Sequence, residues 1–205
     1  ANYTDNYKHI RRTNLLLQNA EAYAKPEDIK QYIGEAYFFR AYSYFDLLQL
    51  YGDVIITKKP LDITDPEMKV KRNDRSEVVD LIIDDLNHAV ENLPAFKELT
   101  TEEEGRISKE GAQAFLSRVA LYEGTWQKSR NGNQNTQRSA NLLDIAAKAA
   151  RTVIDAKYGY TFRLFGTDSE TKILGDSAQK YMFILENEKS NPAGIKKSSN
   201  HEYIF

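Results

Sequence analysis

Residues 26–52 read PEDIKQYIGEAYFFRAYSYFDLLQLYG, and this stretch decides the fold class. Residues spaced at helical intervals run through it, and they are Ile29, Ile33, Ala36, Tyr37, Arg40, Tyr44, Leu47 and Leu48. Pro26 favours the start of a helix, and Gly52 after Tyr51 favours its end. Because apolar residues cover much of its circumference, we expect this helix to pack on two sides.

Similar periodicity predicts further helices on both sides of this stretch. Including the helix just described, helices are expected at residues 3–22, 26–51, 76–93, 108–126 and 139–156, and a short additional helix is expected at 177–188. Ser76 and Ser108 are expected to be N-caps. Residues 53–74, which include the β-branched run Val54-Ile55-Ile56-Thr57, predict an extended loop, and residues 202–205 predict a short terminal strand.

A short pattern, Ala-x3-Arg-x3-Tyr, occurs twice. It is formed by Ala36, Arg40 and Tyr44, and again 78 residues later by Ala114, Arg118 and Tyr122. Tetratricopeptide helix pairs repeat about every 34 residues, so this offset corresponds to roughly two units with loop insertions. The sequence therefore predicts an all-α, tetratricopeptide-like helical repeat array with long loops and a short terminal strand, as one domain over residues 1–205. A chance match between two apolar helices is the alternative.

Composition excludes several classes of function. The 28 basic and 30 acidic residues are interspersed and give a net charge of −2, so no basic patch for nucleic acid is expected. The chain has no cysteine, which excludes disulfides and cysteine-based metal or redox sites within it. No apolar run approaches the roughly 18 residues of a membrane-spanning helix.

No motif for catalysis, a cofactor or a metal is evident. The chain lacks a glycine-rich phosphate loop, a Gly-x-Ser-x-Gly elbow and a His-Glu-x2-His motif, so we expect neither an enzyme nor a bound cofactor. Its histidines, His9, His88 and His201, form no i, i+4 pair. Three acidic residues, Asp62, Asp65 and Glu67, have the oxygen atoms that calcium prefers but lack the spacing of a calcium loop, so a solvated connection is expected instead.

Several segments, in order, resemble the SusD/RagB family. They are Tyr7-x2-Ile10-Arg11-Arg12-x-Asn14, Glu35-Ala36-x-Phe38-x-Arg40-Ala41-x2-Tyr44 leading to Tyr51-Gly52, Asp85-Leu86-x2-Ala89, Gly105-Arg106-Ile107-Ser108-Lys109 with Leu121-Tyr122, the alanine-rich helix from Ala146 to Ile154, and Asn200-x-Glu202-x-Ile204-Phe205. The chain departs from the family at Ile55-Ile56, where a proline is usual, and in a long polar insertion between Phe165 and Asn200.

The resemblance implies a non-enzymatic, surface-exposed lipoprotein of the outer membrane of a Gram-negative, Bacteroidetes-type bacterium. Such a protein binds a glycan and delivers it to a SusC-like TonB-dependent transporter. This chain would be the helical half of a larger protein, touching the membrane only through a lipid on a cysteine upstream of Ala1. The alternatives are a tetratricopeptide adaptor that holds a peptide in its concave groove and, as a third class, a glycan-processing enzyme.

Candidate glycan-binding residues lie at the start of the chain. Sugar sites pair an aromatic ring, which covers the C–H face of a pyranose, with amides that bond its hydroxyls. Asn2, Tyr3, Asn6 and Tyr7 supply both, and Tyr23 beside the first interhelical loop is a further candidate, as is Tyr32. The alternative is a frayed first turn with tyrosines directed to the core.

A second group of residues is expected to be structural. Asn14 lies on an apolar stripe, where a buried amide must be hydrogen-bonded. Arg40 and Arg118 are interpreted as internal residues with stems on apolar surface rather than as ligand-binding residues. The remaining members of this group are Tyr44, Tyr122 and the helix-ending Gly52.

Overall fold

The structure, a computed structural model, describes residues 2–62, 64–103, 105–130, 136–185, 187–197, 200 and 202. Its α-helices are α1 (Asn2–Glu21), α2 (Lys30–Tyr51), α3 (Arg75–Asn92), α4 (Lys109–Arg130), α5 (Thr136–Ile154) and α6 (Ala178–Met182). Short 3-10 helices precede α2 at Pro26–Ile29 and interrupt the loop after it at Pro66–Lys69. The all-α fold class is confirmed, and the described residues contain one isolated β-bridge and no longer strand.

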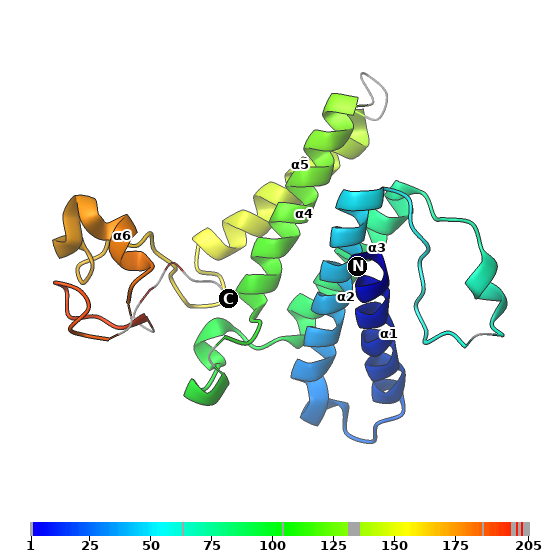
Figure 1. Ribbon diagram of the computed structural model, residues 1–205, viewed down its shortest axis with the longest axis horizontal. Coiled ribbons are helices and arrows are strands. Elements are labelled where there is room, and N and C mark those ends of the chain that lie inside the picture. Colours follow the sequence, from blue (N-terminus) through cyan, green and yellow to red (C-terminus); the bar gives the residue numbers. More distant parts are fainter. Residues whose placement is uncertain are drawn as a thin grey trace.

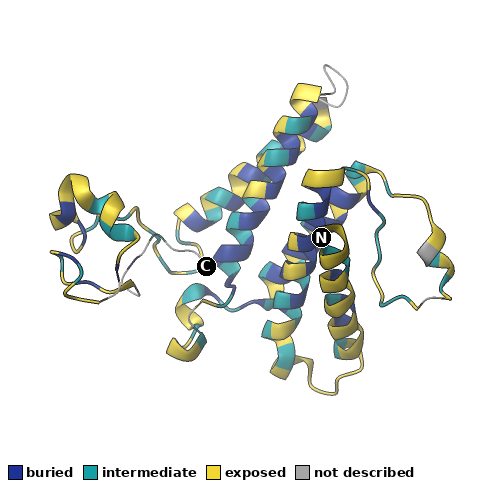
Figure 2. Cartoon of the chain, in the orientation of Figure 1, coloured by how far each residue is buried: buried dark blue, intermediate teal, exposed yellow. Residues whose placement is uncertain are grey.

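Each long helix packs on its neighbour in the sequence, as in a helical repeat array (Figure 1). The pairs in contact are α1 with α2, α2 with α3, α3 with α4, and α4 with α5. Since α2 contacts both α1 and α3, the prediction of two-sided packing is confirmed. Its fully buried Phe38, Tyr44 and Leu47 join Ile82 and Leu86 of α3 in one core, and Figure 2 shows buried residues concentrated along these facing sides.

The N-terminal cap of α3 differs from the prediction. Asp74, not Ser76, is the capping residue: its Oδ1 accepts a hydrogen bond from the Ser76 backbone N–H at 2.8 Å. The Glu77 carboxylate accepts in return from the Asp74 backbone N–H at 3.0 Å, which completes a capping box. The expected cap at Ser108 is confirmed, since its hydroxyl accepts from the Gly111 N–H at 3.2 Å.

Other differences concern the ends of elements. The fourth helix continues past Trp126 to Arg130, and the short helix expected at 177–188 is reduced to α6. Of the expected terminal strand at 202–205, Glu202 lies in a turn and the other residues are outside the described part of the chain.

The described residues between 53 and 74 form the expected extended loop, which projects to one side of the helices while α6 lies on the other (Figure 1). The loop is closed at its base, where Val54 and Asn73 form an antiparallel bridge. The Asn73 N–H donates to the Val54 carbonyl and the Ile56 N–H donates to the Asn73 side chain, each at 2.9 Å. Within the described residues, no helix is both long and apolar enough to cross a bilayer.

Candidate functional site

A groove of about 300 Å³ lies between α1 and the first part of the 53–74 loop. We call it the Tyr3 groove. The residues that line it are Tyr3, Tyr7, Arg11, Ile55, Thr57, Lys59, Leu61 and Glu67. Two of the six candidate glycan-binding residues, Tyr3 and Tyr7, are therefore together in one groove.

The two walls of the Tyr3 groove follow from two periodicities. Tyr3, Tyr7 and Arg11 are four residues apart on α1 and so lie on one face of the helix. On the loop side, the lining residues from Ile55 to Leu61 alternate, as residues on one face of an extended segment do. One face of α1 therefore lies opposite one face of the extended loop segment, with the groove between them.

The aromatic side of the groove combines one exposed and one anchored tyrosine. The Tyr7 hydroxyl donates to the Ile55 carbonyl at 2.7 Å, and burial raises the pKa of Tyr7 far above its ordinary value. The Tyr3 ring packs on Tyr7 at 4.8 Å between centroids and edge-on against Tyr51 at 5.2 Å. Tyr3 remains 39% exposed, so its ring is held in place while much of it stays accessible to a ligand.

The acidic residues of the loop bind a lysine. The Lys59 ammonium lies 2.9 Å from Glu67 and 3.6 Å from Asp65, and these carboxylates raise the pKa of Lys59. The Asp65 side chain also accepts from the Asp62 backbone N–H at 3.1 Å. The carboxylates of Asp65 and Glu67 thus bind Lys59, and that of Asp65 also binds the loop backbone. Among the described residues, no group of histidines and carboxylates has the arrangement of a metal site.

A buried ion pair at the centre of the helices involves Arg40. Its Nε and Nη2 donate to the two oxygens of Asp85 at 2.8 and 2.6 Å, and its Nη1 donates to Asn14 Oδ1 at 2.8 Å. Asp85 is completely buried, and this burial raises its pKa while the Arg40 hydrogen bonds act in the opposite direction. Arg40 is therefore an internal residue of α2 that connects α1, through Asn14, with α3, through Asp85.

The same network continues to the loop wall of the groove. The Asn14 Nδ2 donates to the Thr57 carbonyl at 2.9 Å and to the Lys59 carbonyl at 3.3 Å. The Thr57 N–H donates to the Tyr44 hydroxyl at 2.8 Å. Asn14 and Tyr44 are buried, so two core side chains determine where the backbone of this wall lies.

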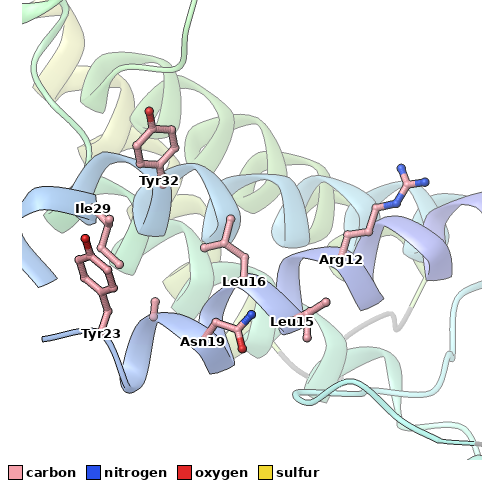
Figure 3. A pocket seen from close by; sticks show the side chains of 8 residues that line it. Arg12, Leu15, Leu16, Asn19, Tyr23, Ile29 and Tyr32 are labelled. Carbon is pink, nitrogen blue, oxygen red and sulfur yellow. The ribbon is translucent and has the colours of Figure 1, made fainter.

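The other predicted glycan-binding residues lie elsewhere. Asn2 is exposed on the first turn of α1, outside the lining of the groove. The Asn6 amide donates to Asp46 at 2.5 Å and is already engaged with α2. Tyr23 lies in a different and more open pocket of about 470 Å³ at the far end of α1, beside Leu16 and Tyr32 (Figure 3).

The prediction for one structural residue, Arg118, is wrong. Arg118 is exposed on α4, so its interpretation as an internal residue is wrong: its neighbour Val119 points to the core in its place. Tyr122 of the same pattern is half-buried and packs edge-on against Phe45 at 5.4 Å. Gly52 ends α2 with a φ of 72°, a conformation that glycine adopts readily.

Two further ion pairs were not predicted. Arg75 Nη2 lies 2.7 Å from Glu123, which is completely buried, and its guanidinium stacks 4.0 Å from the centroid of Trp126. Arg106 donates to both oxygens of Glu35 at 2.7 and 2.8 Å. These partners are 48 and 71 residues apart in the sequence, so no local spacing indicates them.

Comparisons with known proteins agree on one family. The SusD-like family model described as "starch-binding associating with outer membrane" matches residues 1–121. SusD-like protein P38 of Formosa agariphila is 34% identical over 117 residues, which are 57% of this chain and 22% of that protein. SusD-like protein P2 of the same organism is 26% identical over 202 residues, 96% of this chain and 38% of that protein.

Solved structures show the same relationship. A SusD-like protein from Bacteroides fragilis matches with a TM-score of 0.71 and 26% identity over 100% of this chain and 32% of its own. A laminarin-binding SusD-like protein matches with a TM-score of 0.62 and 28% identity over 79% of this chain and 32% of its own. This chain thus spans less than two fifths of the length of these relatives. Since the family match covers more than half of the sequence, the chain belongs to the SusD-like family.

Proposed function

We propose that this chain binds an oligosaccharide in the Tyr3 groove, as part of a cell-surface protein that captures glycans without transforming them. The observation that carries the proposal is the Tyr3 ring, which is fixed by two neighbouring tyrosines and yet 39% exposed beside the groove. Membership of a family described as starch-binding supports the same class of ligand.

The chemistry of the groove suits a sugar. The face of an aromatic ring covers the apolar C–H surface of a pyranose, and polar groups around it bond the hydroxyls. In the Tyr3 groove the ring is on α1, while Thr57, Lys59 and Glu67 supply donors and acceptors from the loop. Because Asn14 and Tyr44 already hold the loop backbone, little conformational entropy is lost when a ligand binds.

The proposal extends to the cellular role. We infer a lipoprotein on the outer face of the outer membrane, with its lipid outside this chain, that passes its ligand to a SusC-like TonB-dependent transporter. The family description, which associates its members with the outer membrane, supports this location. Binding and release would then replace catalysis.

Affinity electrophoresis tests the proposal directly. The chain is run through gels that contain starch, laminarin, xyloglucan, polygalacturonate or carrageenan, alongside the variants Tyr3→Ala and Tyr23→Ala. Loss of an aromatic face costs about 1–1.5 kcal/mol, so Tyr3→Ala should weaken binding to the retarding polymer about five- to tenfold. Tyr23→Ala is the matched control, because Tyr23 is an exposed tyrosine just beyond the end of α1 and lies outside the groove.

Two results would contradict the proposal. Retardation that is unaffected by Tyr3→Ala but lost with Tyr23→Ala would move the glycan site to the pocket of Figure 3. No retardation by any polymer would favour the peptide-adaptor alternative, which a peptide-library screen on the same chain would then examine.

A further inference from the structure

The charged residues of the Tyr3 groove are unequally paired. Lys59 and Glu67 face each other at 2.9 Å, and Asp65 also lies against Lys59, so these charges are compensated within the loop. Arg11 lines the same groove, and within the described part of the chain it makes neither a hydrogen bond nor an ion pair. It is the one cation of the lining whose charge is not compensated by a described carboxylate.

The neighbouring charged residues do not change this. Lys8, one turn before Arg11 on α1, is paired with Asp5 at 3.2 Å. Arg12 follows Arg11 directly but lines the separate pocket that contains Tyr23, as Figure 3 shows. Glu67 is the acidic residue of the lining, and it is held by Lys59 rather than by Arg11.

The position of Arg11 relative to Tyr3 is set by the helix. Eight residues of α-helix separate them by about 12 Å along the axis, and both side chains lie on the face that borders the groove. An extended oligosaccharide that covers the Tyr3 ring with one unit therefore brings a later unit to the guanidinium.

We propose that the Tyr3 groove selects an anionic oligosaccharide, whose carboxylate or sulfate ester is bound by Arg11. This inference rests on the proposed glycan-binding function and specifies the ligand class. A guanidinium presents N–H donors in a planar fork that fits the oxygens of a carboxylate or sulfate, and charge-assisted bonds of this kind are stronger than neutral ones. A neutral sugar has no anionic group with which Arg11 could form an ion pair.

Two pairs of ligands that differ only in charge test the inference by isothermal titration calorimetry. Oligogalacturonate is compared with its methyl ester, and a carrageenan oligosaccharide with its desulfated form, on the unchanged chain and on Arg11→Gln and Arg12→Gln. We expect at least tenfold tighter binding of the charged member of one pair, with the preference weakened at higher salt. Arg11→Gln should abolish the preference for the charged ligand, and Arg12→Gln should retain it.

The pair that shows the preference identifies the anionic group. Binding of a neutral polysaccharide in the gels, without preference in either pair, would overturn the inference and leave the proposed function intact. A preference that survives Arg11→Gln would overturn it as well. Binding of no glycan at all would remove the proposed function and this inference together. Both arginines are exposed, so neither variant is expected to affect folding.

Discussion

Replacement of Arg40 by leucine is the most informative test of the central ion pair. Arg40→Leu removes two hydrogen bonds to Asp85, at 2.8 and 2.6 Å, and one to Asn14 at 2.8 Å. The side chain of Asp85 has no exposed surface, so water cannot replace the lost donors. The variant thus leaves a buried carboxylate without its counter-charge.

The expected loss is large because of the charge that remains. Breaking a buried ion pair from one side costs about 3–5 kcal/mol. For a chain of this size, such a loss lowers Tm by roughly 6–20 °C. In the double variant Arg40→Leu/Asp85→Leu no charge stays buried, so most of the lost stability should return.

The pH dependence of the same variant has a definite sign. Burial raises the pKa of Asp85, and the Arg40 hydrogen bonds oppose that rise. Without Arg40 the pKa rises further, so the folded state holds a proton that the unfolded state releases above its ordinary pKa of about 3.9. When the folded state binds more protons, the free energy of unfolding falls as pH rises. The stability deficit of Arg40→Leu should therefore be smaller near pH 4.5 than at pH 7.

Urea denaturation, followed by circular dichroism at pH 4.5 and pH 7, measures these differences. The proteins compared are the unchanged chain, Arg40→Leu, Asp85→Leu and the double variant. A cost below about 1 kcal/mol for Arg40→Leu, or a double variant no more stable than Arg40→Leu, would contradict a stabilising role for the ion pair. An equal deficit at both pH values would show that Asp85 does not take up a proton when its partner is lost.

Three further variants test individual contacts by the same denaturation assay. Gly34→Ala should cost about 1–3 kcal/mol, because a Cβ there would lie 2.9 Å from the backbone N of Leu93; an unchanged midpoint would mean that α2 and the end of α3 can separate freely. Asp74→Ala should cost about 1 kcal/mol through loss of the capping box, whereas Asp74→Ser should retain most of the stability. Tyr44→Phe leaves the partly buried Thr57 N–H without its acceptor and should cost about 1 kcal/mol, and a neutral result would contradict the role given to that hydroxyl.

The helices were predictable because their apolar periodicity is local and extends over several turns. The segment 26–52 carries its own start and stop residues: the structure ends α2 at Tyr51 as expected, while Pro26 begins a 3-10 helix and α2 itself begins at Lys30. The cap of α3 was misplaced because Asp74 and Ser76 are both good capping residues, and the choice depends on the return bond from Glu77.

The candidate site was only partly predictable. Tyr3 and Tyr7 were found because aromatic residues beside amides are a local signal, but Asn6 is bound by Asp46, 40 residues away, which no spacing indicates. Arg118 was misjudged because a three-position repeat matches residue types without determining which helix face meets a neighbour. The wall from Ile55 to Leu61 was missed, since its alternation acquires meaning only when the loop packs against α1.

The ion pair and the groove are connected parts of one structure. Arg40 orients the Asn14 amide by donating to its oxygen, and this leaves the Asn14 Nδ2 free to donate to the Thr57 and Lys59 carbonyls. An amide has a single oxygen and a single NH2 group, so both bonds are satisfied in one orientation only. The polarity of the core network thus determines the position of the loop wall, and through it the width of the groove beside Tyr3. Buried residues outside the groove can in this way specify the shape of the surface for which glycan binding is proposed.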